Sequence, residues 1–556
     1  MENNPKESLN FIEEIIEKDL KEGKFKDGIH TRFPPEPNGY LHIGHAKAIW
    51  INFSLAKKYN GRTNLRFDDT NPTTEEIEYV ESIKRDIRWL GYDWEDREYF
   101  ASDYFDQLYE FAIKLIKKGL AYVDHSTSEE MAAQKGSPGV PATPSRYRDR
   151  SIEENLELFK QMKDGLLPDG HCVLRAKIDL SSPNLLMRDP IIYRIKHQHH
   201  HRTGDEWCIY PMYDFAHGQS DSIEKITHSL CSLEFIHHRP LYDWFIEKLE
   251  IFPSKQYEFA RMNVSYMLTS KRKLLKLVQD GYVSGWDDPR MPTLSGMRNR
   301  GIPAQAIIKF CEKTGVAKRD ILIEIELFES CIREELNKIS ERVMVVSKPL
   351  KLTITNFPSG HQELLTVEIN PESPERGFRE ITFSNTLYIE NDDFMIDAPK
   401  NYFRLTPGGF VRLKHAYVIK CENYLLDDAG NVVEIFASYV PESRSGNDTS
   451  GLKVKGTIHW VNANDAVPCV LRNYERLFTD PTPSDHHNRD FIEFFNHDSL
   501  VEVKNAMMEP YLLKNSYDKH FQFLRLGYFF RAQSDNDTII FNRTISLKDS
   551  WAKQSK

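Results

Sequence analysis

The sequence has few cysteines, no long apolar run and no apolar leader, and each absence excludes a class of protein. Its seven cysteines are odd in number and scattered over 556 residues, with no Cys-x-x-Cys pair. This disfavours a disulfide framework and a zinc ribbon, and it suits a reducing cytoplasm. No apolar stretch approaches the ~20 residues of a membrane span, and the N-terminus lacks a secretory signal. We therefore expect a cytoplasmic protein without a membrane partner.

The composition is that of an ordinary globular protein. Hydrophobic residues make up 40% and charged residues 28% of the chain, so a sizeable core is expected. The length corresponds to roughly three or four domains. The formal net charge of -10 disfavours nonspecific binding to nucleic acid. It leaves specific binding open, because a local basic face neutralises phosphates.

The stretch Pro35–His45 has the composition of a tight loop between a strand, Ile29–Phe33, and a helix, Ala46–Lys58. Unpaired N–H groups in the first turn of a helix attract anions, and His42 and His45 could donate hydrogen bonds to phosphate oxygens. A proline-rich loop with two solvated histidines is the alternative. The tetrapeptide His42-Ile43-Gly44-His45 alone does not decide between the two interpretations.

The segment after this helix completes a βαβ unit. Thr63–Phe67 is a predicted strand that leads into Asp68–Pro72, and carboxylates at the carboxyl end of a parallel strand point into the ligand crevice of a doubly wound sheet. The same residues are also good turn and helix-capping residues, and the two roles are compatible. Upstream, Phe11–Glu22 has the apolar spacing of a helix, with a capping box of Asn10 and Glu13.

The middle of the chain is expected to contain an insertion. Helical spacing predicts helices over Thr74–Leu90 and Asp103–Lys118, and loop-like composition then indicates an inserted segment that ends near Arg202. The run His199–His201 is not expected to bind a metal, because successive residues of regular structure cannot face one ion.

Strand and helix patterns then return. Strands are predicted within Trp207–His217, at Thr227–Glu234 and at Tyr257–Asn263. The charged run after Thr269 is by default a solvated helix start, but a Ser-Lys pair just beyond a strand could cover a triphosphate. Helical patterns continue over Pro303–Ser340.

Beyond Val343 the pattern changes to short alternating strands. Leu350, Leu352 and Ile354 alternate with polar residues, as does a run from Val411 to Ile419. Such alternation with turns between the runs predicts one or two all-β units, so we place a domain boundary near Glu341.

Two of these motifs, in this order, carry a resemblance to a known family. His42-Ile43-Gly44-His45 and the distant Ser270-Lys271 resemble the paired ATP motifs of class I aminoacyl-tRNA synthetases. The longer form Pro35–His45 resembles the glutaminyl and glutamyl branch. The likeness runs nearly end to end and is strengthened by three further segments: Arg66–Pro72, Tyr210–Phe215 and Gly285–Thr293.

The resemblance implies an α/β multidomain fold, with a Rossmann-type doubly wound parallel sheet, an inserted acceptor-binding domain, a helical subdomain and C-terminal antiparallel β-barrels. The expected divisions are the first half of the catalytic domain with its leading helix (1–102), the acceptor-end-binding insert (103–206), the second catalytic half (207–272), the helical subdomain (273–340) and an anticodon-binding region of two barrels (341–556).

The amino-acid pocket distinguishes the two members of this branch. Glutamyl members carry an arginine on the strand that resembles Thr227–Glu234, whereas this chain has Cys231 there. Burying the glutamate carboxylate without a cation costs several kcal/mol, but a neutral amide needs only hydrogen-bond partners. The resemblance therefore implies ATP-dependent ligation of L-glutamine to tRNA(Gln) through an adenylate, with release of AMP and pyrophosphate. A glutamyl enzyme of the archaeal and eukaryotic type, and a catalytically silent tRNA-binding paralogue, are the alternatives.

The resemblance also assigns site residues. The catalytic residues are His42, His45 and Lys271. Arg32 would bind the substrate carboxylate, Asp68 its ammonium group and Tyr213 its side-chain amide, with Cys231 and Gln256 completing the glutamine site. The ATP site would comprise Glu36, Pro37, Asn38, His42, Ile43, Gly44, His45, Ala46, Lys47, Ala48, Ser232, Arg261, Met262, Thr269, Ser270 and Lys271.

The tRNA contacts follow from the same resemblance. Anticodon readers would be Arg342, Arg404, Arg412 and Gln522. Mg²⁺ would be carried by ATP rather than by a protein site, and the protein is expected to be a monomer. The chain departs from the family at several places: Phe403 stands where a lysine usually precedes Arg404, Thr269 replaces Met or Leu, and Pro138 and His237 lie at positions that contact the acceptor end in relatives.

Overall fold

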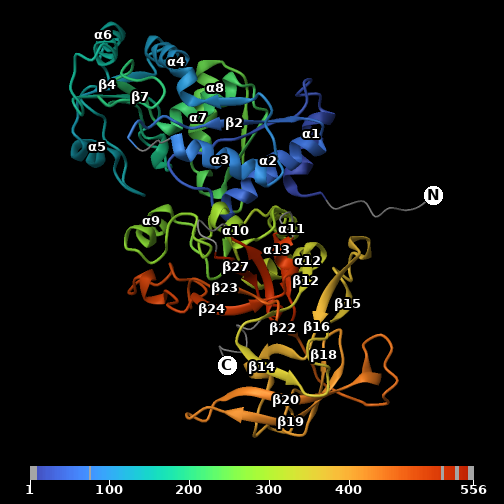
Figure 1. The fold of residues 1–556 in the computed structure, drawn as a ribbon. Coiled ribbons are helices and arrows are strands. Elements are labelled where there is room, and N and C mark those ends of the chain that lie inside the picture. Colours follow the sequence, from blue (N-terminus) through green and yellow to red (C-terminus); the bar gives the residue numbers. More distant parts are fainter. Residues whose placement is uncertain (1–8, 74–76, 515–518, 533–537, 549–556) are drawn as a thin grey trace.

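The N-terminal half is built on a parallel sheet whose strand order reverses in the middle. The computed structural model describes residues 9–73, 77–514, 519–532 and 538–548 (Figure 1). The parallel strands are β1 (His30–Phe33), β2 (Arg62–Phe67), β3 (Glu98–Phe100), β8 (His228–Ser232) and β9 (Lys255–Phe259). The Thr227 N–H donates to the His30 carbonyl at 2.9 Å, so β8 lies beside β1. The strands lie in the order β3-β2-β1-β8-β9, and all of them are parallel. From β1 the chain adds β2 and β3 on one side, and later adds β8 and β9 on the other side. Doubly wound sheets bind ligands at such a switch point, which here lies between β1 and β8.

The helices that cover this sheet follow the predicted apolar spacing. They are α1 (Phe11–Lys21), α2 (Ile43–Lys58), α3 (Ile77–Trp89), α7 (Tyr213–Ile223) and α8 (Arg239–Leu249). The predicted capping box of Asn10 and Glu13 is confirmed. Helix α2 begins three residues earlier than predicted, because His42 caps it. The predicted first residues of the next helix, 74–76, lie outside the described residues.

The insert forms an antiparallel sheet of its own, in the order β4-β5-β6-β7. Its elements are α4 (Phe105–Lys117), β4 (Ala121–Asp124), α5 (Ser128–Lys135), α6 (Ile152–Lys163), β5 (Val173–Ala176), β6 (Ile191–Ile195) and β7 (Ile209–Pro211). Strand β7 pairs with β6, so the strand predicted after Trp207 extends the sheet of the insert and not the catalytic sheet. The predicted division at residue 206 therefore falls about five residues too early.

A helical region connects the sheet to the barrels. It contains β10 (Met262–Val264), α9 (Lys271–Gln279), α10 (Leu294–Arg300), α11 (Ala304–Thr314), β11 (Ile321–Ile323) and α12 (Ile325–Ile339). Two predictions are wrong here. The strand Tyr257–Asn263 is broken, because the Ala260 N–H leaves the sheet and donates to the Ala317 carbonyl at 2.8 Å. The helical pattern over Pro303–Ser340 is interrupted by β11, which pairs with β10.

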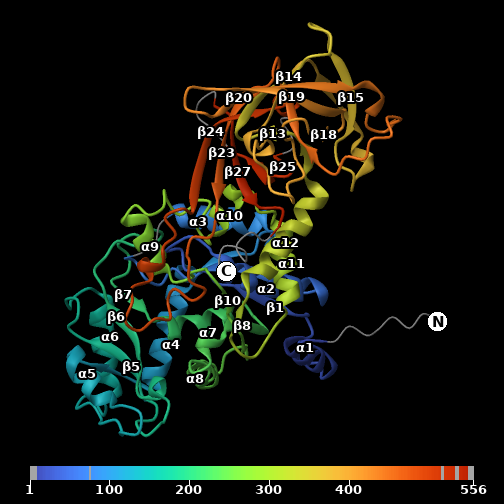
Figure 2. The same ribbon diagram turned by 90° about the horizontal axis from the view of Figure 1, so that it is seen from below.

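The C-terminal half folds into two seven-stranded sheets that curl into near-closed barrels, as predicted (Figures 1 and 2). The proximal barrel contains β12 (Glu341–Val343), β13 (Val345–Val346), β23 (Val467–Tyr474), β24 (Leu500–Met508), β25 (His520–Phe523), β26 (Gly527–Arg531) and β27 (Ile540–Ile545). The distal barrel contains β14 (Pro349–Ile354), β17 (Thr386–Glu390), β18 (Phe410–Leu413), β19 (Val418–Leu426), β20 (Val432–Val440), β21 (Thr457–Ile458) and β22 (Trp460–Asn462). A hairpin of β15 (Glu363–Glu368) and β16 (Phe378–Phe383) projects between them.

The chain leaves the proximal barrel after β13, builds the distal barrel and returns. Strand β12 begins at Glu341, the residue near which the sequence predicts the boundary. The alternating run from Val411 to Ile419 is not one strand, because His415 turns the chain with a φ of 64° and separates β18 from β19.

One apolar cluster joins the catalytic sheet to the proximal barrel. It contains buried side chains from the face of the sheet that α2 and α3 cover, from the helical region and from the barrel, among them Phe33, Leu65, Phe310, Leu336, Tyr528 and Ile545. These parts therefore pack as one body. Among the described residues, no helix has the length and apolar character needed to span a membrane.

Candidate active site

A cleft of about 640 Å³ opens at the carboxyl ends of β1, β2 and β8. The loop before α2 forms one wall, and the segment that leads into α9 forms the opposite wall. Fifteen of the residues predicted for the ATP and amino-acid sites line it: Glu36, Asn38, His42, Gly44, His45, Ala48, Asp68, Tyr213, Cys231, Ser232, Arg261, Met262, Thr269, Ser270 and Lys271. The two distant sequence motifs thus meet across one cavity.

The backbone N–H groups at the start of α2 are already hydrogen-bonded. The Ile43 N–H donates to the Pro292 carbonyl at 3.0 Å, and the Gly44 N–H donates to His42 Nδ1 at 3.1 Å. The His42 N–H donates in turn to His45 Nδ1 at 3.1 Å. The prediction that unpaired helix N–H groups form the anion site is therefore wrong, because the two histidines cap the helix themselves. Anion binding at this wall depends on side chains.

The capping fixes which nitrogen of each histidine carries a proton. Because Nδ1 accepts a backbone hydrogen bond in both His42 and His45, Nε2 holds the ring proton. The two rings lie 3.9 Å apart. Burial lowers the pKa of His45 to about 4, and burial together with the neighbouring His45 holds the pKa of His42 well below its usual value. Both rings are neutral N–H donors at neutral pH.

Lys271 crosses the loop from the other wall. A Cβ atom built on Gly39 would lie 2.9 Å from Lys271 Cε and 3.3 Å from its Nζ, so the lysine passes directly over this glycine. The Lys271 ammonium also lies 6.0 Å from the ring centroid of Tyr79. The absence of a side chain at Gly39 is what allows the two motifs to approach.

The segment Gly285–Thr293 holds the loop in place. Trp286 stacks on Tyr40 with ring centroids 5.9 Å apart, and Thr293 Oγ1 donates to the Trp286 carbonyl at 2.5 Å. The Leu294 N–H donates to the Leu41 carbonyl at 2.8 Å. In the sequence this segment is recognisable only as a family motif. In the structure it supports the loop directly.

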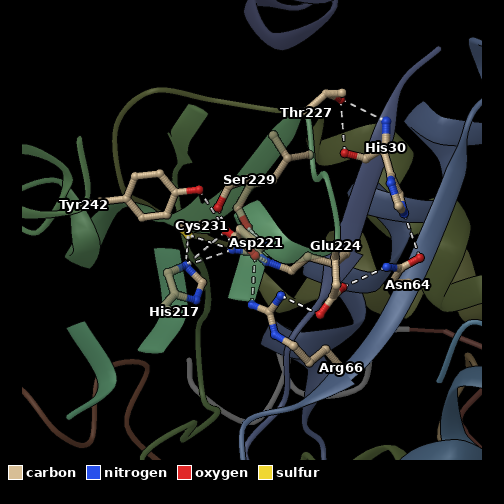
Figure 3. Close-up of polar contacts among 12 residues, drawn as sticks. His30, Asn64, Arg66, His217, Asp221, Glu224, Thr227, Ser229, Cys231 and Tyr242 are labelled. Carbon is tan, nitrogen blue, oxygen red and sulfur yellow. Dashed lines mark hydrogen bonds and ion pairs between the residues drawn. The ribbon is translucent and has the colours of Figure 1, made fainter. Parts of the chain in front are cut away.

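A buried network of charges lies beneath the cleft (Figure 3). Asp221, from α7, accepts hydrogen bonds from Arg32 Nε at 3.0 Å and from Arg66 at 2.8 Å. Arg66 also donates to Glu224 at 3.0 Å. Although burial disfavours a charge at Asp221, Arg32 and Arg66 hold the pKa of this carboxyl well below its usual range. The positive charges of Arg32 and Arg66 are thus balanced by the negative charges of Asp221 and Glu224.

Arg32 is placed in this network and not at the surface of the cleft. Its guanidinium is fully buried and donates further to the Leu230 carbonyl at 2.9 Å and to Ser229 Oγ at 2.7 Å. The prediction that Arg32 binds the substrate carboxylate is not supported by this geometry, because Asp221, the Leu230 carbonyl and the Ser229 hydroxyl occupy the guanidinium.

The groups between this network and the cleft are neutral. Cys231 Sγ lies 3.5 Å from the Arg32 guanidinium, and burial raises the pKa of its thiol. His217 has its pKa lowered to about 3 by burial, so the imidazole carries no charge. Burial also raises the pKa of Tyr213 well above its usual value, and its ring stacks on His217 at 5.0 Å. The pocket floor therefore offers hydrogen-bonding groups without a net charge.

Across the pocket from this neutral floor lies an ionisable group, the carboxyl of Asp68. Burial and the nearby Glu36 raise the pKa of its carboxyl to about 7. It accepts a hydrogen bond from Thr70 Oγ1 at 3.0 Å. A buried carboxylate with a raised pKa is stabilised in its charged form by a ligand cation.

The neighbouring Asp69 anchors this strand end to the insert. It accepts hydrogen bonds from the Ser102 N–H at 2.8 Å and from Ser102 Oγ at 2.6 Å, and His201 Nε2 lies 3.2 Å from its carboxylate. His200 Nε2 lies 2.7 Å from the Asp69 carbonyl, and its Nδ1 accepts from the Arg202 N–H at 3.2 Å. Asp69, His200 and His201 come close enough to hold a metal ion, but these contacts are those of a hydrogen-bonded clamp.

Five predicted residues besides Arg32 do not line the cleft: Pro37, Ile43, Ala46, Lys47 and Gln256. Since α2 begins at Ile43, its helical period turns Ile43, Ala46 and Lys47 into the core, where burial lowers the pKa of Lys47. The Gln256 amide instead donates to the Phe235 carbonyl at 3.2 Å and to Glu258 at 3.0 Å.

The residues predicted to read an anticodon lie in two pairs, one on each barrel. Arg342 and Gln522 are cross-strand partners in β12 and β25 of the proximal barrel. In the distal barrel, Arg404 pairs with Asp393 at 3.1 Å, and Arg412 pairs with an aspartate and donates to a backbone carbonyl. Asp393 also accepts from Arg525 of the proximal barrel at 2.7 Å. Sequence reasoning missed this bridge, because the two residues are 132 positions apart.

Comparison with known proteins gives matches along almost the whole chain. The family model for the catalytic domain of class I tRNA synthetases (E and Q) matches residues 28–338, and two models for the anticodon-binding domain of the same family match residues 340–440 and 457–532. The chain is 52% identical to the glutamine–tRNA ligase of Bradyrhizobium diazoefficiens, over 98% of this chain and 97% of that protein. It is similarly 51% identical to that of Vibrio vulnificus (98% of each) and 52% identical to that of Clostridium perfringens (99% of each).

Proposed function

The chain belongs to the class I tRNA synthetases of the glutamate and glutamine branch, and we propose that it is the member that attaches L-glutamine to tRNA(Gln). The reaction consumes ATP, passes through a glutaminyl-adenylate and releases AMP and pyrophosphate. The observation that carries the choice of amino acid is the neutral pocket floor over a balanced network of buried charges. A glutamate side chain would bring an uncompensated negative charge to this floor.

The roles of the cleft residues follow from their chemistry. Asp68 would bind the substrate ammonium group, and the protonated Tyr213 hydroxyl would meet the side-chain amide. Arg32 and Gln256 would act from behind the pocket wall, by positioning Cys231, Ser229 and the strand ends. A site built to hydrogen-bond a neutral amide rejects a carboxylate of the same shape by a factor on the order of 10⁴.

The ATP end of the cleft supports a reaction that depends on positioning. The glutamine carboxylate attacks the α-phosphate, and charge develops on the departing pyrophosphate. The neutral Nε2–H groups of His42 and His45 and the ammonium of Lys271 are donors suited to this charge. Each such donor is typically worth about 10²–10³ in rate. Mg²⁺, when bound, neutralises phosphate charge. Of the three carboxylates that line the cleft, Glu234 pairs with Arg261 at 3.2 Å. The other two, Glu36 and Asp68, are too few for an all-protein cage, which fits a metal that is held mainly by ATP and water.

The other domains would bind the tRNA. The insert would hold the acceptor end, from which the terminal ribose hydroxyl attacks the adenylate. Arg342, Arg404, Arg412 and Gln522 would read anticodon bases, because arginine and amide groups suit the edges of unstacked bases. Catalytic and anticodon-binding regions lie in one chain, which supports a monomer. All seven cysteines are free thiols, in keeping with work in the cytoplasm.

The test of the function is ATP–pyrophosphate exchange with glutamine and with glutamate, in the presence of tRNA(Gln). We expect exchange with glutamine and a preference over glutamate on the order of 10⁴. A preference for glutamate would overturn the assignment. Exchange with neither amino acid, by protein that still binds tRNA, would identify a catalytically silent paralogue.

Replacement of Lys271 tests the ATP site. Lys271→Ala is expected to lower pyrophosphate exchange by at least about tenfold, because a cation beside the leaving group is lost, and to leave tRNA affinity nearly unchanged. Lys273→Ala is the matched control, since Lys273 lies in the same helix but donates to Ser484 at 2.8 Å, away from the cleft. Equal activity of the two variants would refute the role of Lys271.

The raised pKa of Asp68 predicts a pH dependence. With a pKa of about 7 in the free protein, the ionised fraction falls roughly tenfold between pH 8 and pH 6. Because the carboxylate form binds the ammonium group, the dissociation constant for glutamine should rise by about the same factor over this range. Isothermal titration calorimetry measures it. Asp68→Asn should bind weakly at every pH, and a flat profile for the unaltered protein would contradict the role of Asp68.

A further inference from the structure

An exposed aromatic ring with a cation over it lies beside the two distal arginines. The Phe403 side chain is 52% exposed, and Lys455 Nζ lies 5.1 Å from the centroid of its ring. None of the ring–ring contacts among the described residues involves Phe403. The ring is therefore available to a planar partner.

The backbone fixes the ring and the lysine relative to each other. A Cβ atom on Gly456 would lie 1.8 Å from the Phe403 carbonyl oxygen, so the two chain segments touch backbone to backbone. The Arg412 N–H donates to the Gly456 carbonyl at 3.0 Å. Lys455, Phe403 and Arg412 thus belong to one rigid surface, and Arg404 follows Phe403 directly.

The charges of this surface differ in availability. Arg404 is paired with Asp393 and Arg412 with Asp448. None of the ion pairs within the described part of the chain includes Lys455, so its charge is not balanced by a protein carboxylate. The ion pairs hold the two arginine side chains in fixed orientations. The ammonium of Lys455 is able to neutralise a phosphate of a ligand.

We propose that Phe403 and Lys455 form a stacking subsite for one unpaired base of the tRNA anticodon loop. The base stacks on the ring of Phe403, and the Lys455 ammonium pairs with the adjacent phosphate. A ring that stacks bases beside a cation that follows the backbone is a recurrent way to bind single-stranded RNA. The proposal rests on the tRNA-binding function proposed above.

The first experiment uses tRNA(Gln) transcripts with 2-aminopurine at each anticodon position in turn. Stacking quenches the fluorescence of this base, so binding should quench one position strongly. Phe403→Leu keeps an apolar side chain without a stacking face. It should relieve the quenching at that position and weaken tRNA affinity by about tenfold, whereas Phe403→Trp should preserve both.

The second experiment measures the salt dependence of tRNA affinity. Lys455→Ala should reduce the slope of the logarithm of affinity against the logarithm of salt concentration by about 0.7, the value for one phosphate contact on a single strand. The matched controls are Phe11→Leu and Lys318→Ala. They alter another phenylalanine–lysine pair, with Nζ 4.8 Å from the ring centroid, at the start of α1, which Figure 1 shows in the catalytic half and away from the distal barrel. Both controls should behave like the unaltered protein.

The outcomes separate this proposal from the function on which it rests. If the unaltered protein does not charge or bind tRNA(Gln), the proposed function fails. If it does, and Phe403→Leu binds with unchanged affinity and unchanged quenching at every position, the stacking subsite is refuted. An unchanged salt slope for Lys455→Ala would refute the phosphate contact.

Discussion

The ion pairs of Asp221 are the interaction on which the catalytic half depends. Asp221 comes from a helix after the insert, whereas its partners Arg32 and Arg66 come from the first two strands of the sheet. Each of these groups is buried, and loss of one partner from a buried pair typically costs about 3–5 kcal/mol. The network therefore joins the two halves of a sheet that the insert separates. It also sets the charge beneath the pocket floor, on which the selectivity that we propose depends.

The loop before α2, which forms one wall of the cleft, is held in place without a ligand. His42 and His45 use Nδ1 to cap the helix and keep Nε2–H for a ligand, and residues 286–294 hold the loop from behind. The donors are thus preorganised, which is where electrostatic catalysis gains most. The apolar cluster that continues into the proximal barrel gives this wall a firm connection to the tRNA-binding half.

Local patterns were predictable from the sequence, and long-range pairing was not. The capping box of Asn10 and Glu13 and the strand before the first loop depend on neighbouring residues, and both are confirmed. Of the site residues that the family motifs predict, fifteen line one cleft. The burial of Arg32 in the charge network could not be predicted, because its partner Asp221 is 189 residues away. Lys47 and Gln256 do not line the cleft, because the phase of a helix and the direction of a strand decide where each side chain points.

We propose that the charge balance beneath the pocket selects glutamine over glutamate. The most direct test of this proposal is the ratio of kcat/KM for glutamine to that for glutamate in Asp221→Asn, with folding checked by circular dichroism. Loss of this anion leaves a net positive charge under the neutral floor, and the ratio should fall by at least about tenfold, or ~1.4 kcal/mol. Glu224→Gln removes the same charge, but among the described residues Glu224 forms an ion pair only with Arg66, so this change should lower the ratio less. An unchanged ratio in folded Asp221→Asn would contradict the account.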